Sequence, residues 1–181
     1  MNTVEPIRSK KDIEKIKNIL GEKKKRDLLL FLLGINSGLR ISDLLGLKVS
    51  DVRDKQKIEI TEKKTGKKKS FPIIESVKKL IDKLIKYQPN DSWLFKSQKG
   101  EGAITRIQAY RILKQVGKIA KLTVKIGTHT LRKTFGYHFY KKTKDVALLQ
   151  SILNHSSPKI TLRYIGINQE IIESYLMKFC L

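Results

Sequence analysis

The sequence RDLLLFLLGINSGLRISDLLGL, residues 26–47, contains the strongest structural signals of this chain. Six large apolar side chains follow one another near its start, a pattern typical of a helix that is buried on nearly every side. Gly38 should end this helix, because glycine favours the left-handed position just beyond a helix C-terminus. Ser42 is expected to cap a short second helix, which would hold Arg40 rigidly in the turn between two buried elements.

The sequence on either side of this stretch predicts more helices and one small sheet. Upstream, Ser9 is typical of a helix N-cap, and apolar residues follow it at helical spacing as far as Leu20. Downstream, apolar residues alternate on both sides of Thr65-Gly66, which indicates an antiparallel hairpin over 57–74 with a lysine-rich tip. Helical spacing predicts further helices over roughly 75–87, 104–120, 128–142, 145–153, 157–164 and 168–178. The expected fold class is α+β, mainly α with a small antiparallel β-sheet.

Length and composition favour one domain. The chain has 181 residues, of which 40% are apolar, so it is long enough to bury a single core. It contains no internal repeat and no Gly/Ser-rich linker. We therefore expect a flexible tail over 1–8 and a single domain over 9–181.

The charge of the chain predicts a polyanionic partner. Its 39 Lys and Arg against 17 Asp and Glu give a formal net charge of +22. Basic clusters at 23–26, 63–69 and 141–144 are separated by ordered-looking apolar segments, which favours a folded surface that follows phosphates. Charge alone would also fit a ribosomal, membrane-surface or non-specific contact. The motifs must decide between these.

Cysteine usage and hydropathy predict a cytoplasmic protein. The single cysteine, Cys180, cannot form an internal disulfide and has no neighbours suited to zinc. No apolar run approaches the roughly 18 residues that span a bilayer, and the first twenty residues do not resemble a signal peptide. We expect no membrane partner.

Three short segments in the second half carry residue types suited to a phosphodiester. His129 and Arg132 are three apart at a predicted helix start, so both project from one face beside an anion-favouring helix N-terminus. Asn154 suits the left-handed position at the end of the next helix and turns His155 into a loop. Tyr164 follows nine residues later, a spacing that permits it to fold back beside His155. Taken singly, these could be a capping histidine, a surface salt bridge and a half-buried core tyrosine.

The order of the motifs is more specific than any one of them. The chain resembles the tyrosine recombinase and phage integrase family at Gly38-Leu39-Arg40-Ile41-Ser42-Asp43-Leu44-Leu45, Lys64-Thr65-Gly66, His129-Thr130-Leu131-Arg132, Leu153-Asn154-His155 and Tyr164. This resemblance covers nearly the whole chain. It implies the catalytic-domain fold of that family and a site-specific recombinase or integrase of a phage or mobile element. Such an enzyme cuts and rejoins double-stranded DNA through a 3′-phosphotyrosyl intermediate, with no metal, ATP or other cofactor.

The resemblance also implies a role for individual residues. The catalytic set would be Arg40, Lys64, His129, Arg132, His155 and Tyr164. Asp43 would support the first arginine. The residues expected to contact the DNA backbone are Lys63, Lys67, Lys68, Lys69 and Lys133. The chain departs from the family where glycine is usual at Asn154 and histidine is common at Lys133, and neither position performs the chemistry.

Elementary chemistry agrees with these roles. Attack on a phosphodiester spreads negative charge over the non-bridging oxygens, which Arg40 and Arg132 can neutralise with charge-assisted hydrogen bonds. A tyrosine hydroxyl, with a pKa of about 10, needs help to lose its proton, and His129 is the candidate. The leaving 5′ oxygen needs an acid, for which we prefer Lys64, although Lys63 and Lys67 compete for the assignment. His155 would bind a non-bridging oxygen.

Other functions fit the sequence less well. A metal-dependent nuclease would need clustered carboxylates or histidines, and the three histidines are far apart in the sequence. A DNA-binding module would not require both arginines, both histidines and the tyrosine. A type IB topoisomerase usually has large additional segments.

Two expectations concern assembly. The DNA-grasping N-terminal domain of most family members is absent from this sequence, as in a trimmed or a naturally short recombinase. Segment 168–181 has an apolar face at helical spacing that could dock on its own core or on a neighbouring protomer. The second arrangement would form a tetramer on DNA, with a monomer in its absence.

Overall fold

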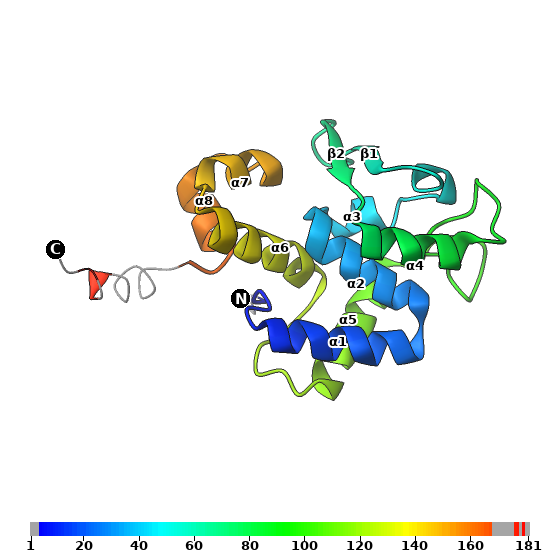
Figure 1. Cartoon of the computed structure of the whole chain (residues 1–181), viewed down its shortest axis with the longest axis horizontal. Coiled ribbons are helices and arrows are strands. Elements are labelled where there is room, and N and C mark those ends of the chain that lie inside the picture. Colours follow the sequence, from blue (N-terminus) through cyan, green and yellow to red (C-terminus); the bar gives the residue numbers. More distant parts are fainter. Residues whose placement is uncertain (1–3, 168–175, 178, 180–181) are drawn as a thin grey trace.

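The central element of the fold is helix α2 (Lys25–Ser37), against which α1, α4 and α6 pack (Figure 1). The computed structural model describes residues 4–167, 176–177 and 179, so the helix expected over 168–178 lies largely outside the described residues. The other elements are α1 (Lys10–Lys23), α3 (Ile41–Leu44), the 3₁₀ turn η1 (Val49–Asp51), β1 (Lys57–Thr61), β2 (Lys68–Pro72), α4 (Glu75–Ile85), α5 (Arg106–Ile119), α6 (Thr128–Thr143), α7 (Val146–Leu153) and α8 (Pro158–Tyr164). The expected fold class, mainly helical with a small antiparallel sheet, is confirmed.

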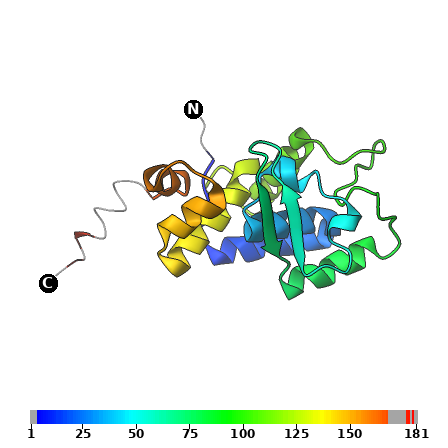
Figure 2. The same cartoon turned by 90° about the horizontal axis from the view of Figure 1, so that it is seen from above.

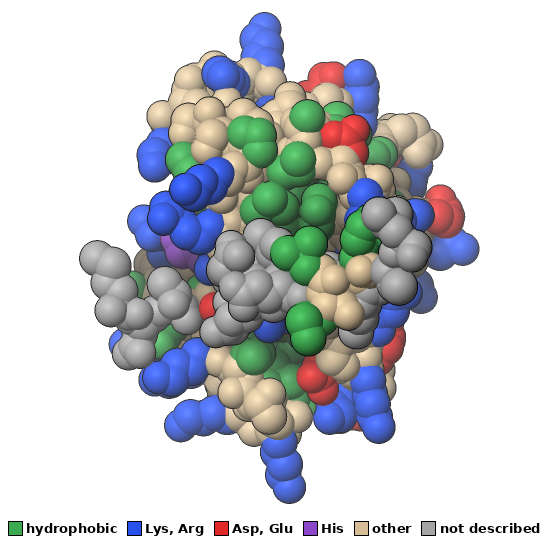
Figure 3. Space-filling view, turned by 90° about the vertical axis from the view of Figure 1, so that its left-hand side faces the viewer, with side chains coloured by type: hydrophobic (Ala, Val, Ile, Leu, Met, Phe, Trp, Pro, Cys, Tyr) green, Lys and Arg blue, Asp and Glu red, His purple; other side chains and the backbone are tan. Residues whose placement is uncertain are grey.

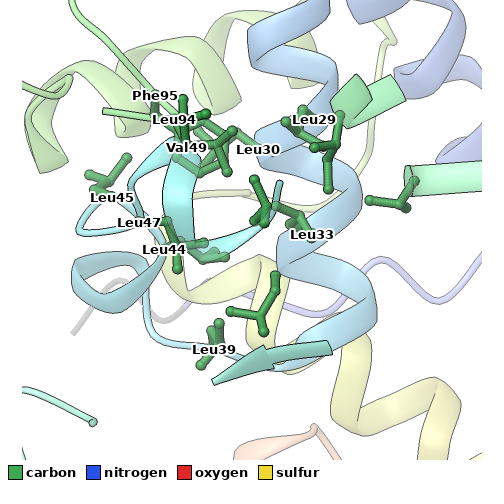
Figure 4. Packing of buried hydrophobic residues seen from close by; sticks show 14 of the residues in the cluster. Leu29, Leu30, Leu33, Leu39, Leu44, Leu45, Leu47, Val49, Leu94 and Phe95 are labelled. Atoms are coloured by element: carbon green, nitrogen blue, oxygen red, sulfur yellow. The ribbon is translucent and has the colours of Figure 1, made fainter. Parts of the chain in front are cut away.

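Helix α2 is buried on several sides because apolar clusters cover it. Figure 4 shows leucines of α2 and leucines around α3 in one buried cluster that also contains Val49 and Phe95. Phe31 points into a second cluster, formed with Ile16 of α1 and Leu113 of α5. The helix ends at Gly38, whose φ of 65° and ψ of 15° place it in the predicted left-handed conformation.

Two glycines allow α6 to approach the end of α2 closely. A Cβ atom on Gly34 would lie 2.5 Å from the Leu131 side chain of α6, and one on Gly38 would lie 2.5 Å from the Phe135 ring. No larger residue fits at either position unless the helices separate. This close approach brings Arg132, one residue beyond Leu131, to the C-terminus of α2.

The two strands form a hairpin that packs beside α3 (Figure 2). Their antiparallel register pairs Ile58 with Phe71 and Ile60 with Lys69. Ile58 is buried, and Ile60 and Phe71 pack against the main apolar cluster, so one face of the hairpin is directed inward. The next inward positions, Glu62 after β1 and Lys69 within β2, carry charges.

Helices α7 and α8 form a small layer on α6 at one end of the molecule (Figure 1). Leu149 and Leu153 of α7 and Ile165 after α8 are fully buried together. This layer brings the end of α8, and with it Tyr164, against α6.

The structure differs from the sequence-based expectations in two places near the site. Residues 4–8 do not form a free tail, because Ile7 is 1% exposed and its N–H donates to Thr134 Oγ1 at 2.9 Å. A lone isoleucine has no periodicity that could predict its burial. Helix α3 begins at Ile41, so Arg40 takes the N-cap position that we assigned to Ser42.

Candidate active site

Arg40 lies where the sequence predicts, between α2 and α3, in an extended conformation with φ of −69° and ψ of 148°. Its Nη1 atom lies 2.6 Å from Oε1 of Glu62, and 21% of its side chain is exposed. Asp43, the expected support, is buried, but its Oδ1 accepts the Lys63 backbone N–H at 3.1 Å. Among the described residues, Arg40 therefore forms its ion pair with Glu62, and Asp43 instead holds the backbone of the hairpin.

Arg132 joins two helix ends. It projects from α6, is 5% exposed, and donates from Nη1 to the carbonyl of Gly38, at the end of α2, and from Nη2 to the carbonyl of Leu153, at the end of α7. Helix C-termini offer carbonyls without intrahelical partners and a partial negative charge, so both contacts stabilise the cation. A guanidinium has five N–H donors, so these two contacts do not exhaust it, and a further side-chain hydrogen bond joins Arg132 to Tyr164.

His155 and Tyr164 meet at the α7–α8 end. Asn154 has φ of 51° and ψ of 52°, the predicted left-handed conformation, and this turns His155 out of the helix. The rings of His155 and Tyr164 lie edge to face, with centroids 4.9 Å apart. His155 Nδ1 lies 3.1 Å from Thr161 Oγ1, and that hydroxyl donates to the Ser157 carbonyl. We therefore assign the proton of the neutral ring to Nδ1, which leaves a lone pair on Nε2.

Burial and the neighbouring cations shift the pKa values of His155 and Tyr164. Burial lowers the pKa of His155 to about 4, with further lowering by Arg132, Arg40 and Lys69. Burial raises the pKa of Tyr164, and the Arg132 and Arg40 guanidiniums oppose that rise. Near neutral pH the imidazole is therefore neutral and the phenol keeps its proton. Arg132 reaches the carbonyl of Leu153, two residues before His155, and His155 lies against Tyr164, so these three side chains gather at one end of α7. The Arg40 guanidinium lowers the pKa of both His155 and Tyr164.

His129 occupies the first turn of α6, as predicted. Burial lowers its pKa, and Arg106, Lys133, Arg132 and Arg40 lower it further in that order. The Thr130 hydroxyl caps this helix by accepting the Gly127 N–H at 3.0 Å. His129 is thus a neutral imidazole near the same group of cations.

The lysines divide between the site and the surface. Lys64 is exposed in the turn 63–65 at the hairpin tip, as are Lys63, Lys67 and Lys68 nearby. Lys67 Nζ donates to Asn154 Oδ1 at 2.8 Å, next to His155. Lys69 is half-buried, with its Nζ atom 3.4 Å from Glu62 Oε1 and donating to the Ile152 carbonyl of α7. The structure thus brings Lys69 into the group, although we expected only a backbone contact from it.

Lys133 also contacts the group. Its Nζ atom lies 5.4 Å from the centroid of the Tyr164 ring, within the usual range of a cation–π interaction. Lys133 and His155 are therefore both neighbours of the Tyr164 ring.

Sequence reasoning missed Glu62, although a signal was present. Glu62 shares the alternation of Ile58 and Ile60, so it continues the inward face of β1. Lys69 shares the inward face of β2 with Phe71 in the same way. A glutamate and a lysine on one inward face predict a buried ion pair. The composition of the hairpin tip indicates only a lysine-rich surface, whereas the alternation of the strands continues inward through Glu62 and Lys69.

The arrangement can bind a phosphate and present a phenol to it. Two guanidiniums and Lys69 gather at the end where Tyr164 lies, and Lys and Arg side chains dominate the charged groups on the face shown in Figure 3. Within the described residues, no three His, Cys, Asp or Glu side chains gather as a metal site. No described helix has the length and apolar character needed to cross a membrane.

Comparisons with known proteins agree with this geometry. Residues 8–170 match the profile of the phage integrase family. "Probable integrase/recombinase YoeC" of Bacillus subtilis (strain 168) is 54% identical over 170 residues, 94% of this chain and 93% of that protein.

Two solved structures share the fold. A crystal structure of XerA recombinase matches with a TM-score of 0.78 at 22% identity, over 99% of this chain and 67% of that one. XerH recombinase bound to palindromic difH substrate, in a post-cleavage complex, matches with a TM-score of 0.70 at 24% identity. That match covers 97% of this chain but 53% of the XerH chain.

Proposed function

This chain belongs to the phage integrase family, and on that premise we propose that it breaks and rejoins DNA strands through a covalent bond to Tyr164. The observation that supports this most is the convergence of Arg40, Arg132, His155 and Tyr164, which come from four separate segments, around one place. Each residue alone has an ordinary structural explanation. Their convergence around a half-buried phenol is what the chemistry of a tyrosine nucleophile requires.

The proposed cleavage step balances as follows. The Tyr164 hydroxyl oxygen bonds to phosphorus, the bond from phosphorus to the 5′ oxygen breaks, and the phenol proton passes to the neutral His129. Lys64, at the exposed hairpin tip, turns toward the DNA and gives a proton to the departing 5′ oxygen. The phosphotyrosyl ester keeps the energy of the broken bond, so attack by a 5′ hydroxyl reverses the step without ATP.

Arg40 and Arg132 supply donors to the non-bridging oxygens, where negative charge grows in the transition state. His155 has no proton on Nε2 while it is neutral, so it must take up a second proton before it can donate to the phosphate. The negative charge of bound DNA favours that uptake, because it raises the pKa of a nearby imidazole.

The proposed partner is double-stranded DNA in the cytoplasm of a bacterial cell. Lysine contacts to phosphates would supply much of the affinity. A tetramer on DNA is proposed to form through segment 168–181 of one protomer. A groove beside the site could receive an apolar helix, because Phe71, Phe135 and Phe139 line it together with basic residues of β2.

The test is covalent capture of DNA. The protein is incubated, without magnesium, with nicked duplex suicide substrates made from the ends of the host element, and the products are separated under denaturing conditions. We expect a protein–DNA band from the wild type and none from Tyr164→Phe. Tyr87→Phe, which removes a hydroxyl from a tyrosine that is 87% exposed, is the matched control. A band that survives Tyr164→Phe would place the nucleophile elsewhere.

A further inference from the structure

Glu62 is a buried acid that the proposed mechanism does not use. It follows β1 and has an exposure of 0%. Removing a carboxylate from water costs several kcal/mol unless partners offset the loss of hydration. The residues that pair with Glu62 therefore indicate its role.

Each oxygen of Glu62 has its own partners. Oε1 lies 2.6 Å from Arg40 Nη1 and 3.4 Å from Lys69 Nζ, and Oε2 accepts the Thr65 hydroxyl at 2.7 Å. Burial raises the pKa of Glu62, but Thr65, Arg40 and Lys69 more than offset that effect and hold the pKa below its usual value. Glu62 is thus an anion shared between two cations.

The backbone of Glu62 fixes the hairpin tip. Its N–H donates to the Lys67 carbonyl at 3.0 Å, and its carbonyl accepts the Gly66 N–H at 2.9 Å. The turn that it closes carries Lys64. One residue therefore contacts the first arginine, the inward lysine and the loop that carries the proposed acid.

The cations held by Glu62 would otherwise repel one another. Arg40 and Lys69 lie near the same oxygen of Glu62, and both Arg40 and Arg132 lower the pKa of Lys69. Lys and Arg side chains also lose up to about 2 kcal/mol of rotamer entropy when they are fixed. A shared carboxylate reduces the repulsion and fixes both side chains before the DNA arrives.

From these contacts we propose that Glu62 is a positioning residue, which aligns Arg40 and Lys69 on the scissile phosphate. The alignment then depends on how the β1–β2 hairpin packs against the rest of the fold. This proposal rests on the proposed function. It assigns Glu62 no contact with the reacting atoms, because its effect passes through the two cations. Lys69 becomes a phosphate-binding residue of the site itself.

The test compares Glu62→Gln with Glu59→Gln. Both variants remove one carboxylate charge from the same strand region, but Glu59 is exposed and pairs with Lys57 at 2.9 Å, away from the site. The rate of covalent capture in a single turnover is measured together with the melting temperature and DNA binding. We expect Glu62→Gln to slow capture on the order of 10-fold to 100-fold, the scale of a small misplacement of a reacting group. We expect Glu59→Gln to stay within about 2-fold, as is usual for surface changes.

A second comparison separates positioning from a general loss of structure. In an Arg40→Ala background, Glu62→Gln should slow capture much less than it does in the wild type, because the guanidinium that Glu62 positions is no longer there. An equal fold loss in both backgrounds would indicate a structural role and overturn the proposal. If Glu62→Gln does not fold, Glu62→Asp decides by the same criterion, since it keeps the charge but withdraws the carboxylate from Arg40.

The outcomes distinguish this proposal from the proposed function. If the wild type captures no DNA, the proposed function fails. If the wild type captures DNA and Glu62→Gln or Glu62→Asp does so as fast as Glu59→Gln, only the positioning role fails.

Discussion

Replacing Arg132 with lysine tests whether one guanidinium serves both the fold and the reaction. In the structure this side chain donates to the Gly38 and Leu153 carbonyls, at the ends of α2 and α7. A lysine ammonium keeps the charge but is a single point, so it can reach one of these carbonyls and leaves the other without a donor. The remaining donors of the planar fork, which we assign to the phosphate, are lost as well.

The magnitudes follow from these contacts. A hydrogen bond to a charged donor contributes about 1.5–3 kcal/mol, so losing one of the two should lower the free energy of unfolding by about that amount. For a chain of this size, that corresponds to a fall in Tm of roughly 3–12 °C. Losing a preorganised donor to the transition state should slow cleavage on the order of 10²–10³-fold.

Two measurements keep these effects apart. Thermal melting gives the stability, and single-turnover covalent capture well below the Tm of the variant gives the reactivity of folded protein. Arg163→Lys is the control, because Arg163 precedes Tyr164 on α8 but is exposed. The reasoning is refuted if Arg132→Lys melts with the wild type and captures DNA within about 3-fold of Arg163→Lys.

Two further predictions concern individual protonation steps. In the first, the bridging 5′ oxygen at the cut is replaced with sulfur, which gives a leaving group that needs no acid because a thiol has a pKa of about 8.5. This substrate should restore covalent capture by Lys64→Ala but not by Lys69→Ala. The opposite result would assign the role of the acid to Lys69. The pKa of His155 is about 4 in the folded protein and about 6.5 when unfolded, so the unfolded state takes up the proton first and stability should fall as the pH drops from about 6.5 to about 4. His155→Asn should lose less stability over that window in melting experiments, and equal losses would contradict the lowered pKa.

Much of the fold follows from local patterns in the sequence. The apolar run of α2 and its glycine end, the Ser9 cap of α1 and the left-handed Asn154 each depend on residues close by in the chain. Local patterns could not place residues 4–8, because the burial of Ile7 is decided by α6, more than a hundred residues away. They also misplaced the start of α3, where Arg40, without a side-chain cap bond, stands in the N-cap position.

Some residues of the site could likewise be predicted from the sequence, and others could not. Motif order was sufficient to single out Arg40, Arg132, His155 and Tyr164, which the structure brings together. It could not reveal which acid pairs with Arg40, because that choice depends on the seating of the hairpin. Asp43 is nearer in sequence and holds the hairpin backbone, whereas Glu62 reaches the guanidinium across the fold.

The cationic site must be stable before any DNA neutralises it, and the helix ends explain how. The carbonyls of Gly38, Ile152 and Leu153 lie at the C-termini of α2 and α7, and they accept from Arg132 and Lys69. Helix C-termini carry a partial negative charge, which offsets the repulsion among the gathered cations. The close contacts of Gly34 and Gly38 with α6 set where the Gly38 carbonyl lies, and the contact of Gly136 with Leu153 and Ile165 holds α7 against α6, so helix packing fixes the geometry of the site in advance. A phosphate would then bind to donors that are already oriented, which is what lowers the cost of reaching the transition state.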